Sequence, residues 1–461
     1  MDTHDFNKYF SILLYLLCGC FIGMAESGQV DSVSEFNNET IDPYVNKKII
    51  LPNKIELTIP SIPDFNLEYD CKQQSYLCVP SEYADIQAAA DVVKPGDNVI
   101  ISPGSYESFI IKRTGVKDKP IRFIAKKGVL INRFNDSGHG ITVRSNFPKK
   151  YYVDNIHLIG FQIESPKKNC IHFTKAISTR PTTGHVISNV SCRNPGTGGF
   201  YLSQVADSYI SQNIIINAGR DSRSSARDHG IYLSNGGTGN LVLYKNIISG
   251  SSTNGIHCNG DMTVDMLDDG THGGINGTDG LISGLIIDSN IIMGNGQNGI
   301  NLDGVQDSIF VNNIIYKNNR HGVRGYAIDA KEGPKRLIFI NNTFLENKSA
   351  IKLSEIVSDY IIFNNLFVRQ SSDEIIVPIK EFSKSNNLVN NSVKFLNLFR
   401  SGFDTITERE ALDMDFYLDN ESSQLVLDKG LLEFMLENAP GYDLKNRVRV
   451  GMPDIGAMET K

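Results

Sequence analysis

The stretch Gly255-Ile256-His257-Cys258 repeats a pattern of small, apolar, polar and apolar residues that recurs along the chain. The other copies are Gly140-Ile141-Thr142-Val143, Cys170-Ile171-His172-Phe173, Gly199-Phe200-Tyr201-Leu202, Gly230-Ile231-Tyr232-Leu233, Gly299-Ile300-Asn301-Leu302, Gly322-Val323-Arg324-Gly325 and Ala350-Ile351-Lys352-Leu353. Their first apolar residues follow one another after 30, 29, 31, 25, 44, 23 and 28 residues. Apolar and polar residues alternate within each copy, which predicts short half-buried strands.

A second pattern, Asn followed by apolar residues, lies between these copies. It occurs at Asn189, Asn213, Asn246, Asn290, Asn313, Asn342 and Asn365. Short strands that repeat every 23 to 30 residues, without helical segments, predict an all-β parallel β-helix, because a single coil cannot bury its apolar face alone. A leucine-rich repeat is the alternative, but its leucine spacing and helical half are missing. The asparagines are predicted to stack as a hydrogen-bonded ladder.

The composition is that of a folded, acidic protein. The chain has 461 residues, 40% of them hydrophobic and 21% charged, so general disorder is excluded. The formal net charge of −7 argues against general nucleic-acid binding, which needs an excess of Lys and Arg. A monomer is expected, because a solenoid buries its core within one chain.

The first 25 residues predict an export signal rather than folded structure. Lys8 precedes an apolar run from Phe10 to Ala25, which ends in the small-x-small pattern Gly23-Met24-Ala25. Residues 1–25 are therefore assigned to a signal peptide, and a secreted, periplasmic or cell-surface location is expected. Two alternatives remain open: a lipoprotein signal, with a lipid anchor on Cys20, and an uncleaved membrane anchor. Residues 26–69 are polar without a clear period and are predicted to be a linker.

Five cysteines follow the signal peptide. Cys71 and Cys78 lie close together in a segment without a core pattern, and in an exported chain they predict a disulfide. Cys170, Cys192 and Cys258 lie inside the apolar repeats and are expected to be buried thiols.

Three segments resemble the right-handed parallel β-helix proteins of the pectate-lyase-like superfamily, which are secreted and act on polysaccharides. Residues 83–106 are similar to the N-terminal helical cap of alginate and chondroitin lyases. The coils with Asn-aliphatic turns resemble the family's repeat, and residues 453–459 resemble its C-terminal ending, with Met458 in place of an aromatic residue. The resemblance implies a capped β-helix over residues 70–395 and a C-terminal cap over residues 396–461. It is specific for the fold and weak for activity, because such folds carry lyases, epimerases, hydrolases and binding proteins.

One outward column of the predicted coils is rich in residues that can do chemistry. The residue after the first apolar position should point outward, which gives Thr142, His172, Tyr201, Tyr232, His257, Asn301, Arg324 and Lys352. Two positions further along, the outward set includes Asn259, Asp303 and Tyr326, and the preceding turns add His229, Arg320 and His321. We expect substrate binding by His172, Tyr201, His229, Asn259, Asn301, Arg320, His321 and Tyr326, with Lys352 outside the site. The alternative is an aromatic and histidine stack that only stabilises the solenoid.

The longest step between copies, 44 residues, contains an acidic insertion. Asp261 and Asp279 in this insertion are candidate ligands of Ca²⁺, which prefers oxygen ligands. A solvated acidic loop is the alternative. With or without Ca²⁺, the insertion would overhang the central coils of the outward column.

The column favours a lyase that cleaves a uronic-acid polysaccharide by β-elimination. The reaction needs a base, an acid and a cation for the developing carboxylate charge. We assign these roles to His257, Tyr232 and Arg324, with Asp303 as a further catalytic residue and Ca²⁺ as a candidate cofactor. A C5-epimerase needs the same set. A glycoside hydrolase needs paired carboxylates, for which Asp303, Asp261 and Asp228 are candidates, and a non-catalytic glycan-binding protein is the third alternative.

Overall fold

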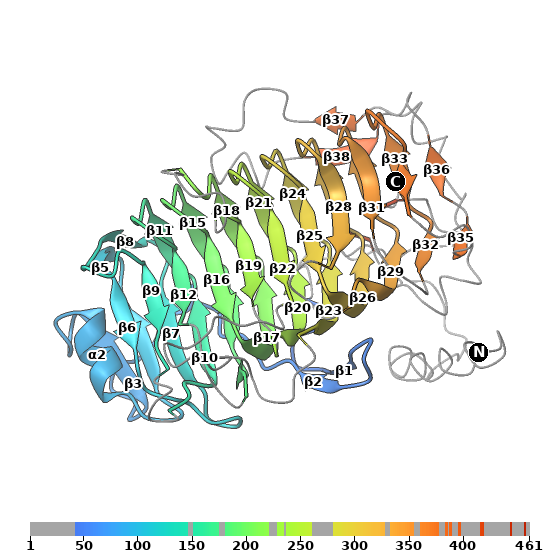
Figure 1. The fold of residues 1–461 in the computed structure, drawn as a ribbon. Helices are drawn as coiled ribbons and strands as arrows, with labels where there is room; N and C mark the ends of the chain where they lie inside the picture. Colours follow the sequence, from blue (N-terminus) through green and yellow to red (C-terminus); the bar gives the residue numbers. More distant parts are fainter. Residues whose placement is uncertain are drawn as a thin grey trace, which may run out of the picture.

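Three parallel β-sheets run the length of the molecule, and each coil of the chain adds one strand to each of them (Figure 1). The computed structural model describes residues 42–145, 151–174, 180–220, 228–234, 237–260, 280–327, 332–354 and 360–377, with short stretches up to residue 457. The stacked coils form an all-β parallel β-helix, as predicted from the repeat.

The three sheets take their strands in chain order. Sheet 1 contains β3 (Tyr76–Val79), β4 (Asn98–Ile101), β7 (Ile121–Ala125), β10 (Ile156–Ile159), β14 (Val186–Ser188), β17 (Val205–Ser211), β20 (Gly239–Tyr244), β23 (Ile282–Asp288), β26 (Val305–Val311), β29 (Lys335–Ile340), β32 (Ile361–Phe363) and β35 (Ser383–Ser385), with β13 (Thr182–Thr183) beside β17. Sheet 2 contains β5 (Gly104–Glu107), β8 (Val129–Arg133), β11 (Gln162–Glu164), β15 (Ser191–Arg193), β18 (Ile214–Ile216), β21 (Ile247–Ser249), β24 (Ile291–Met293), β27 (Ile314–Tyr316), β30 (Thr343–Leu345), β33 (Leu366–Val368) and β36 (Leu388–Val389). Sheet 3 contains β6 (Phe109–Ile111), β9 (Ile141–Val143), β12 (Ile171–Phe173), β16 (Phe200–Ser203), β19 (Ile231–Ser234), β22 (Ile256–Asn259), β25 (Ile300–Asp303), β28 (His321–Tyr326), β31 (Ser349–Leu353) and β34 (Ile375–Ile376).

The apolar positions of the repeat form one continuous core inside the coils. In sheet 3 the predicted inward stack is confirmed, because its members pair in register and are fully buried; they are Ile141, Ile171, Ile231, Ile256, Ile300 and Ile351, with Phe200 and Val323 completing the column. Each strand alone is too short to be stable, so the stacking supplies the buried area that holds it.

The predicted asparagine ladder is present at the turn between sheets 1 and 2. The side-chain oxygen of Asn290 accepts hydrogen bonds from the backbone N and the Nδ2 of Asn246, both at 2.9 Å, and Nδ2 of Asn290 donates to Oδ1 of Asn313 at 3.0 Å. The same bonding continues through Asn342. Asn189 is not a member, because Val190 occupies that position and donates its N–H to Asn213. A second ladder, not predicted, joins Asn295, Asn318, Asn347 and Gln370 after sheet 2.

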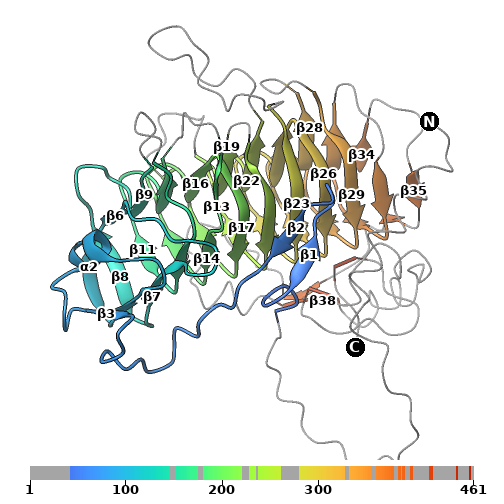
Figure 2. The same cartoon turned by 90° about the horizontal axis from the view of Figure 1, so that it is seen from below.

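One helix and one hairpin lie outside the coils (Figure 2). Helix α2 (Ile86–Val92) lies at the first end of the stack and buries Ile86, Ala89 and Ala90 against the core. Its N-terminus is capped by Asp85, whose side chain accepts the N–H of Ala88. Near the other end, β37 (Phe395–Asn397) pairs antiparallel with β38 (Asp415–Leu418). Most of the predicted C-terminal cap lies outside the described residues, and none of the described helices is long and apolar enough to cross a membrane.

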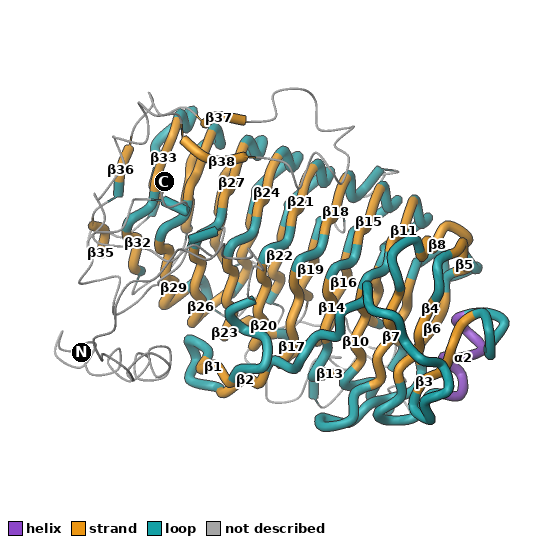
Figure 3. The backbone as a smooth tube through the Cα atoms, turned by 180° about the vertical axis from the view of Figure 1, so that it is seen from behind, coloured by secondary structure: helices purple, strands orange, loops and turns teal. Residues whose placement is uncertain are grey.

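Residues 42–69, the described part of the segment predicted as a linker, pack on the outer face of sheet 1 instead of staying free of the coils. Strands β1 (Lys48–Ile50) and β2 (Glu56–Thr58) form an antiparallel hairpin, and the segment then follows sheet 1 back toward β3 (Figure 3). Its buried residues include Leu51 and Ile59, which share a cluster with Val242 of sheet 1. Isolated apolar residues among polar ones carry no period, which explains why the sequence alone misses this contact.

The cysteines form two disulfides among the described residues. Cys71 is bonded to Cys78, the expected pair. The expectation that Cys170 and Cys192 are buried thiols is wrong, because they are bonded to each other across adjacent coils. The 22-residue separation is nearly one coil, which brings the two side chains together inside the stack. Cys258 is free and buried, as expected.

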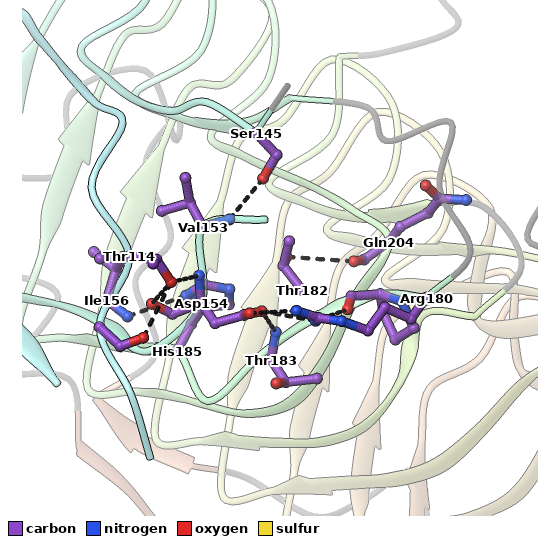
Figure 4. A network of polar contacts seen from close by, with 12 residues as sticks. Thr114, Ser145, Val153, Asp154, Ile156, Arg180, Thr182, Thr183, His185 and Gln204 are labelled. Carbon is purple, nitrogen blue, oxygen red and sulfur yellow. Dashed lines mark hydrogen bonds and ion pairs between the residues drawn. The ribbon is translucent and has the colours of Figure 1, made fainter. Parts of the chain in front are cut away.

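A polar network fixes the loops between sheets 3 and 1 in the early coils (Figure 4). Asp154 accepts two hydrogen bonds from Arg180, at 3.1 and 2.6 Å, and a third from the backbone N of Thr183 at 2.8 Å. The hydrogen bond that Arg180 donates to Asp154 is the main cause of the raised pKa of the Arg180 guanidinium. Nearby, Nδ1 of the fully buried His185 accepts the backbone N–H of Ile156 at 3.4 Å. These contacts hold the chain on both sides of β10.

Candidate functional site

The predicted outward column exists as one row across sheet 3. Register pairs join Thr142 to His172, and the row continues through Tyr201, Tyr232, His257, Asn301, Arg324 and Lys352. A second row joins Asn259, Asp303 and Tyr326. Adjacent strands lie about 4.8 Å apart, so consecutive members of a row are direct neighbours.

These side chains are more buried than an ordinary solvent face. His172, Tyr232, His257, Arg324 and Tyr326 are partly exposed. The remaining predicted residues are mostly buried, with Tyr201 9%, Asn259 8%, His321 7%, Asn301 3%, His229 2% and Asp303 1% exposed, whereas Arg320 is exposed. Buried polar side chains need hydrogen-bond partners, and their contacts therefore define the site.

Thr253, His229 and His257 form a hydrogen-bonded relay. The hydroxyl of Thr253 lies 2.8 Å from the backbone oxygen of Asp228 and 2.6 Å from Nδ1 of His229. Nδ1 of His229 also accepts the backbone N–H of Asn254 at 3.4 Å. Nε2 of His229 lies 2.8 Å from Nδ1 of His257, so the two rings share one hydrogen bond.

One nitrogen of His257 is left outside the relay. Nε2 of His257 is buried and has no hydrogen-bond partner, whereas Nδ1 is bonded to His229. Burial lowers the pKa of His257 to about 3, so the ring is neutral at pH 7. The bond to His229 fixes the orientation of this neutral ring.

Aromatic rings continue along the row on one side of His257. The ring of Tyr232 stacks on that of His257, with centroids 5.0 Å apart and planes 18° apart. Tyr201 meets Tyr232 edge-on at 5.2 Å, and His172 follows at 5.3 Å. His139, which the sequence did not single out, stacks on His172 at 4.1 Å. The rings therefore pack against one another and form a continuous aromatic row.

On the other side of His257, an amide and a cation replace the rings. Nδ2 of Asn301 donates to the hydroxyl of Tyr326 at 2.6 Å. The guanidinium of Arg324 lies over the Tyr326 ring, 4.8 Å from its centroid, and its Nε is buried without a partner. The site therefore changes from aromatic to cationic across His257 and Asn301.

Sequence reasoning missed a pair of stacked asparagines, Asn254 and Asn298, two positions before β22 and β25 of sheet 3. Oδ1 of Asn254 accepts hydrogen bonds from the backbone N and the Nδ2 of Asn298, both at 3.0 Å. Nδ2 of Asn298 also donates to Asn301, and Oδ1 of Asn298 accepts the backbone N–H of His321. The available signal was the polar residue before each small residue of the repeat, as in Asn254-Gly255. This pair orients the outward row, and Thr253 lies at its edge.

The predicted metal ligands cannot be placed. Asp261 and Asp279 lie outside the described residues, so Ca²⁺ binding stays a prediction, as do the signal peptide and a lipid on Cys20. Within the described parts of the chain, no group of three or more His, Cys, Asp or Glu side chains is arranged to hold a metal ion. The hydrolase pair of Asp303 and Asp261 is likewise outside what the structure can place, whereas Asp228 is buried beside the relay.

Comparisons with known proteins show a likeness in structure alone. No protein-family model matches the chain, and no curated protein is similar to it in sequence. Among solved structures it is similar to pectate lyase Pel9A, with a TM-score of 0.55 and 13% identity over 84% of this chain and 96% of that chain. An alginate lyase from Paenibacillus sp. str. FPU-7 matches with a TM-score of 0.47 and 15% identity over 66% and 95%, and a rhamnogalacturonan lyase with 0.47 and 17% over 66% and 82%. The stacked parallel sheets and the likeness to Pel9A show that the chain has a parallel β-helix fold.

Proposed function

We propose that this protein is a polysaccharide lyase, exported from the cell, that cleaves a uronic-acid polymer by β-elimination. The observation that carries the proposal is the partnerless Nε2 of His257, a buried nitrogen in the outward row of sheet 3. Aromatic side chains at Tyr232 and Tyr201 on one side and the cation of Arg324 on the other match a substrate made of sugar rings with carboxylates. The fold shared with pectate lyase Pel9A agrees with this reading.

In the proposed reaction, Nε2 of His257 removes the proton α to the carboxylate of one uronate unit. Arg324 neutralises the charge that develops on that carboxylate. The electron pair then forms the carbon–carbon double bond as the bond to the 4-oxygen breaks, and the Tyr232 hydroxyl protonates the leaving oxygen. The hydrogen bond between Nδ1 of His257 and Nε2 of His229 lets the two rings share the positive charge that the proton gained by His257 brings, which a ring with so low a pKa would otherwise resist.

The test is a screen of the purified protein on alginate, pectate, glucuronan and glycosaminoglycans. Release of the unsaturated product, followed by its ultraviolet absorbance, supports a lyase, and proton exchange at C5 without cleavage identifies an epimerase instead. On the polymer that the protein turns over, His257→Ala should lose about 10²–10⁴-fold in rate, the usual contribution of general base catalysis.

His157→Leu is the matched control, because His157 is buried in sheet 1, away from the row. It removes one histidine and should leave the rate near that of the wild type. Full activity of His257→Ala on a confirmed substrate would refute the assignment of the base. Binding without turnover of any uronate polymer would favour the non-catalytic alternative.

A further inference from the structure

Two pairs of like charges are stacked in neighbouring coils beyond Asn301. Arg324 of β28 pairs in register with Lys352 of β31. Arg320 and Lys348 hold the same relation in the preceding turns, where the backbone N of Lys348 donates to the oxygen of Arg320 at 2.6 Å. Neighbouring strands are about 4.8 Å apart, so each stack places two positive residues directly side by side, which is normally destabilising.

These four cations form no ion pair in the described part of the chain. None of them has an Asp or Glu oxygen within 4.0 Å, although Asp373 and Glu374 lie in the adjoining turn of the next coil. Other cations of this and the next coil are paired: Arg336 with Asp307 at 2.5 Å, and Arg369 with Glu346 at 3.0 Å. The coils therefore form ion pairs elsewhere and none within this cluster, which is the kind of local conflict found at functional sites.

The environment of His321 shows that the four charges converge. Its ring is buried, and its Nδ1 lies 2.7 Å from the Ser349 hydroxyl. Burial first, and then Lys352, Arg324, Lys348 and Arg320, lower the pKa of His321 to about 4. The ring is neutral at pH 7 and adds no charge, so it acts as a polar spacer between the cations of its coil.

The cluster directly continues the row that contains the proposed base. Asn301 is the register partner of both His257 and Arg324, so Arg324 is two strands from His257 and Lys352 is three. The buried Nε of Arg324 without a partner lies in this continuation. A polymer lying along the row would place the carboxylate of the reacting unit at Arg324 and the anionic group of the next unit at Lys352.

We propose that Arg320, Arg324, Lys348 and Lys352 form a binding site for two anionic groups, carboxylate or sulfate, on successive sugar units of the polymer. Each coil contributes two cations and holds one anionic group. The inference rests on the proposed function only in placing the polymer along sheet 3. Because one strand spacing is close to the length of one sugar unit, the site selects polymers charged on every unit over polymers charged on alternate units. Lys352, which the sequence places outside the site, is part of it.

The test measures binding rather than turnover, by calorimetry in the His257→Ala background. The probes are a homopolymeric uronate tetramer, a tetramer with uronate at alternate units, and a tetramer of neutral sugars sulfated on every unit. The double variant Lys348→Ala/Lys352→Ala should weaken binding of a tetramer charged on every unit about tenfold or more and remove most of its salt dependence. The probe that binds more tightly without the substitutions identifies carboxylate or sulfate as the natural group.

The matched control is Lys94→Ala/Lys335→Ala, which removes the same charge from an exposed turn and from β29 of sheet 1. It should bind like the background protein. The lysine double variant should melt at the same or a slightly higher temperature, because a like-charge contact is relieved. Equal affinity in both double variants, equal affinity for both uronate tetramers, or no binding of any charged tetramer would overturn the inference.

The two proposals fail separately. Binding through these lysines without turnover of any polymer would support the anion-binding site and refute the lyase activity. Turnover of a uronate polymer with normal binding in Lys348→Ala/Lys352→Ala would support the lyase activity and refute the anion-binding site.

Discussion

At the scale of single residues, a chain of hydrogen bonds holds the ring of His257. Thr253 contacts the oxygen of Asp228 and Nδ1 of His229, and Nε2 of His229 contacts Nδ1 of His257. His229 and Thr253 do not touch the reacting atoms in this arrangement. They act as positioning residues that orient His257.

Substitution of Thr253 tests this role. Thr253→Val keeps the shape and removes the hydroxyl, so His229 loses its contact at Nδ1 and orients His257 less firmly. On a confirmed substrate we expect kcat to fall about tenfold or more with little change in KM, since ground-state binding is untouched. Thr253→Ser should restore most of the rate. A Thr253→Val enzyme with normal kcat, or one that Ser does not rescue, would contradict the positioning role.

The pH profile gives a second readout of the same relay. Because the pKa of His257 is about 3, the rate should show no inflection from this residue near pH 6.5.

At the scale of elements, the strands are held in register mainly by the buried asparagine ladder. Strands of three to seven residues in the central coils offer few ladder hydrogen bonds of their own. Asn290 is fully buried, accepts two hydrogen bonds from Asn246, and donates to the backbone oxygen of Leu243 at 2.9 Å. The ladder therefore satisfies turn backbone that would otherwise be buried without partners.

Removing one rung of this ladder should be costly. Asn290→Ala leaves the N–H groups of Asn246 and the oxygen of Leu243 without partners, so we expect a loss of about 3 kcal/mol in the free energy of unfolding. Asn319→Ala, at an exposed turn where the side chain donates only to the oxygen of Gly296, is the control and should cost about 0.5 kcal/mol or less. Chemical denaturation followed by circular dichroism measures both. Equal losses would show that the ladder is not a main source of stability.

At the scale of the whole molecule, several histidines are buried in a neutral state. The pKa of His157 is lowered to about 3 and that of His185 to about 4, in both cases first by burial. His257 and His321 are lowered to about 3 and about 4. These groups lie on two different sheets, so they make stability depend on pH throughout the stack.

The direction follows from proton binding. Below about pH 6.5 these histidines bind protons in the unfolded chain but stay neutral in the folded protein. Their contribution to the free energy of unfolding is therefore fully present above pH 6.5 and is lost as pH falls toward 4. Each such group contributes a slope of up to about 1.4 kcal/mol per pH unit. We expect the melting temperature to fall steadily between pH 6.5 and 4, and less steeply in His157→Leu. A melting temperature that is constant over this interval would contradict the neutral state of these rings.

The sequence by itself determined the coil, because a repeat of alternating apolar positions has one way to bury its apolar side. It therefore predicted the inward isoleucines, the ladder through Asn246, Asn290, Asn313 and Asn342, and the register of the outward row. These features depend only on the spacing along the chain, which the period makes visible.

Only the tertiary structure decided which contacts cross between coils. The Cys170–Cys192 bond, the packing of the hairpin on sheet 1 and the relay through Thr253 each join residues that no local pattern links. Four cations of neighbouring coils likewise converge around His321 although they are spread over 33 positions of the chain. Proton positions and uncompensated charge are properties of side chains in three dimensions, because burial and the nearest partners, rather than residue type, set them.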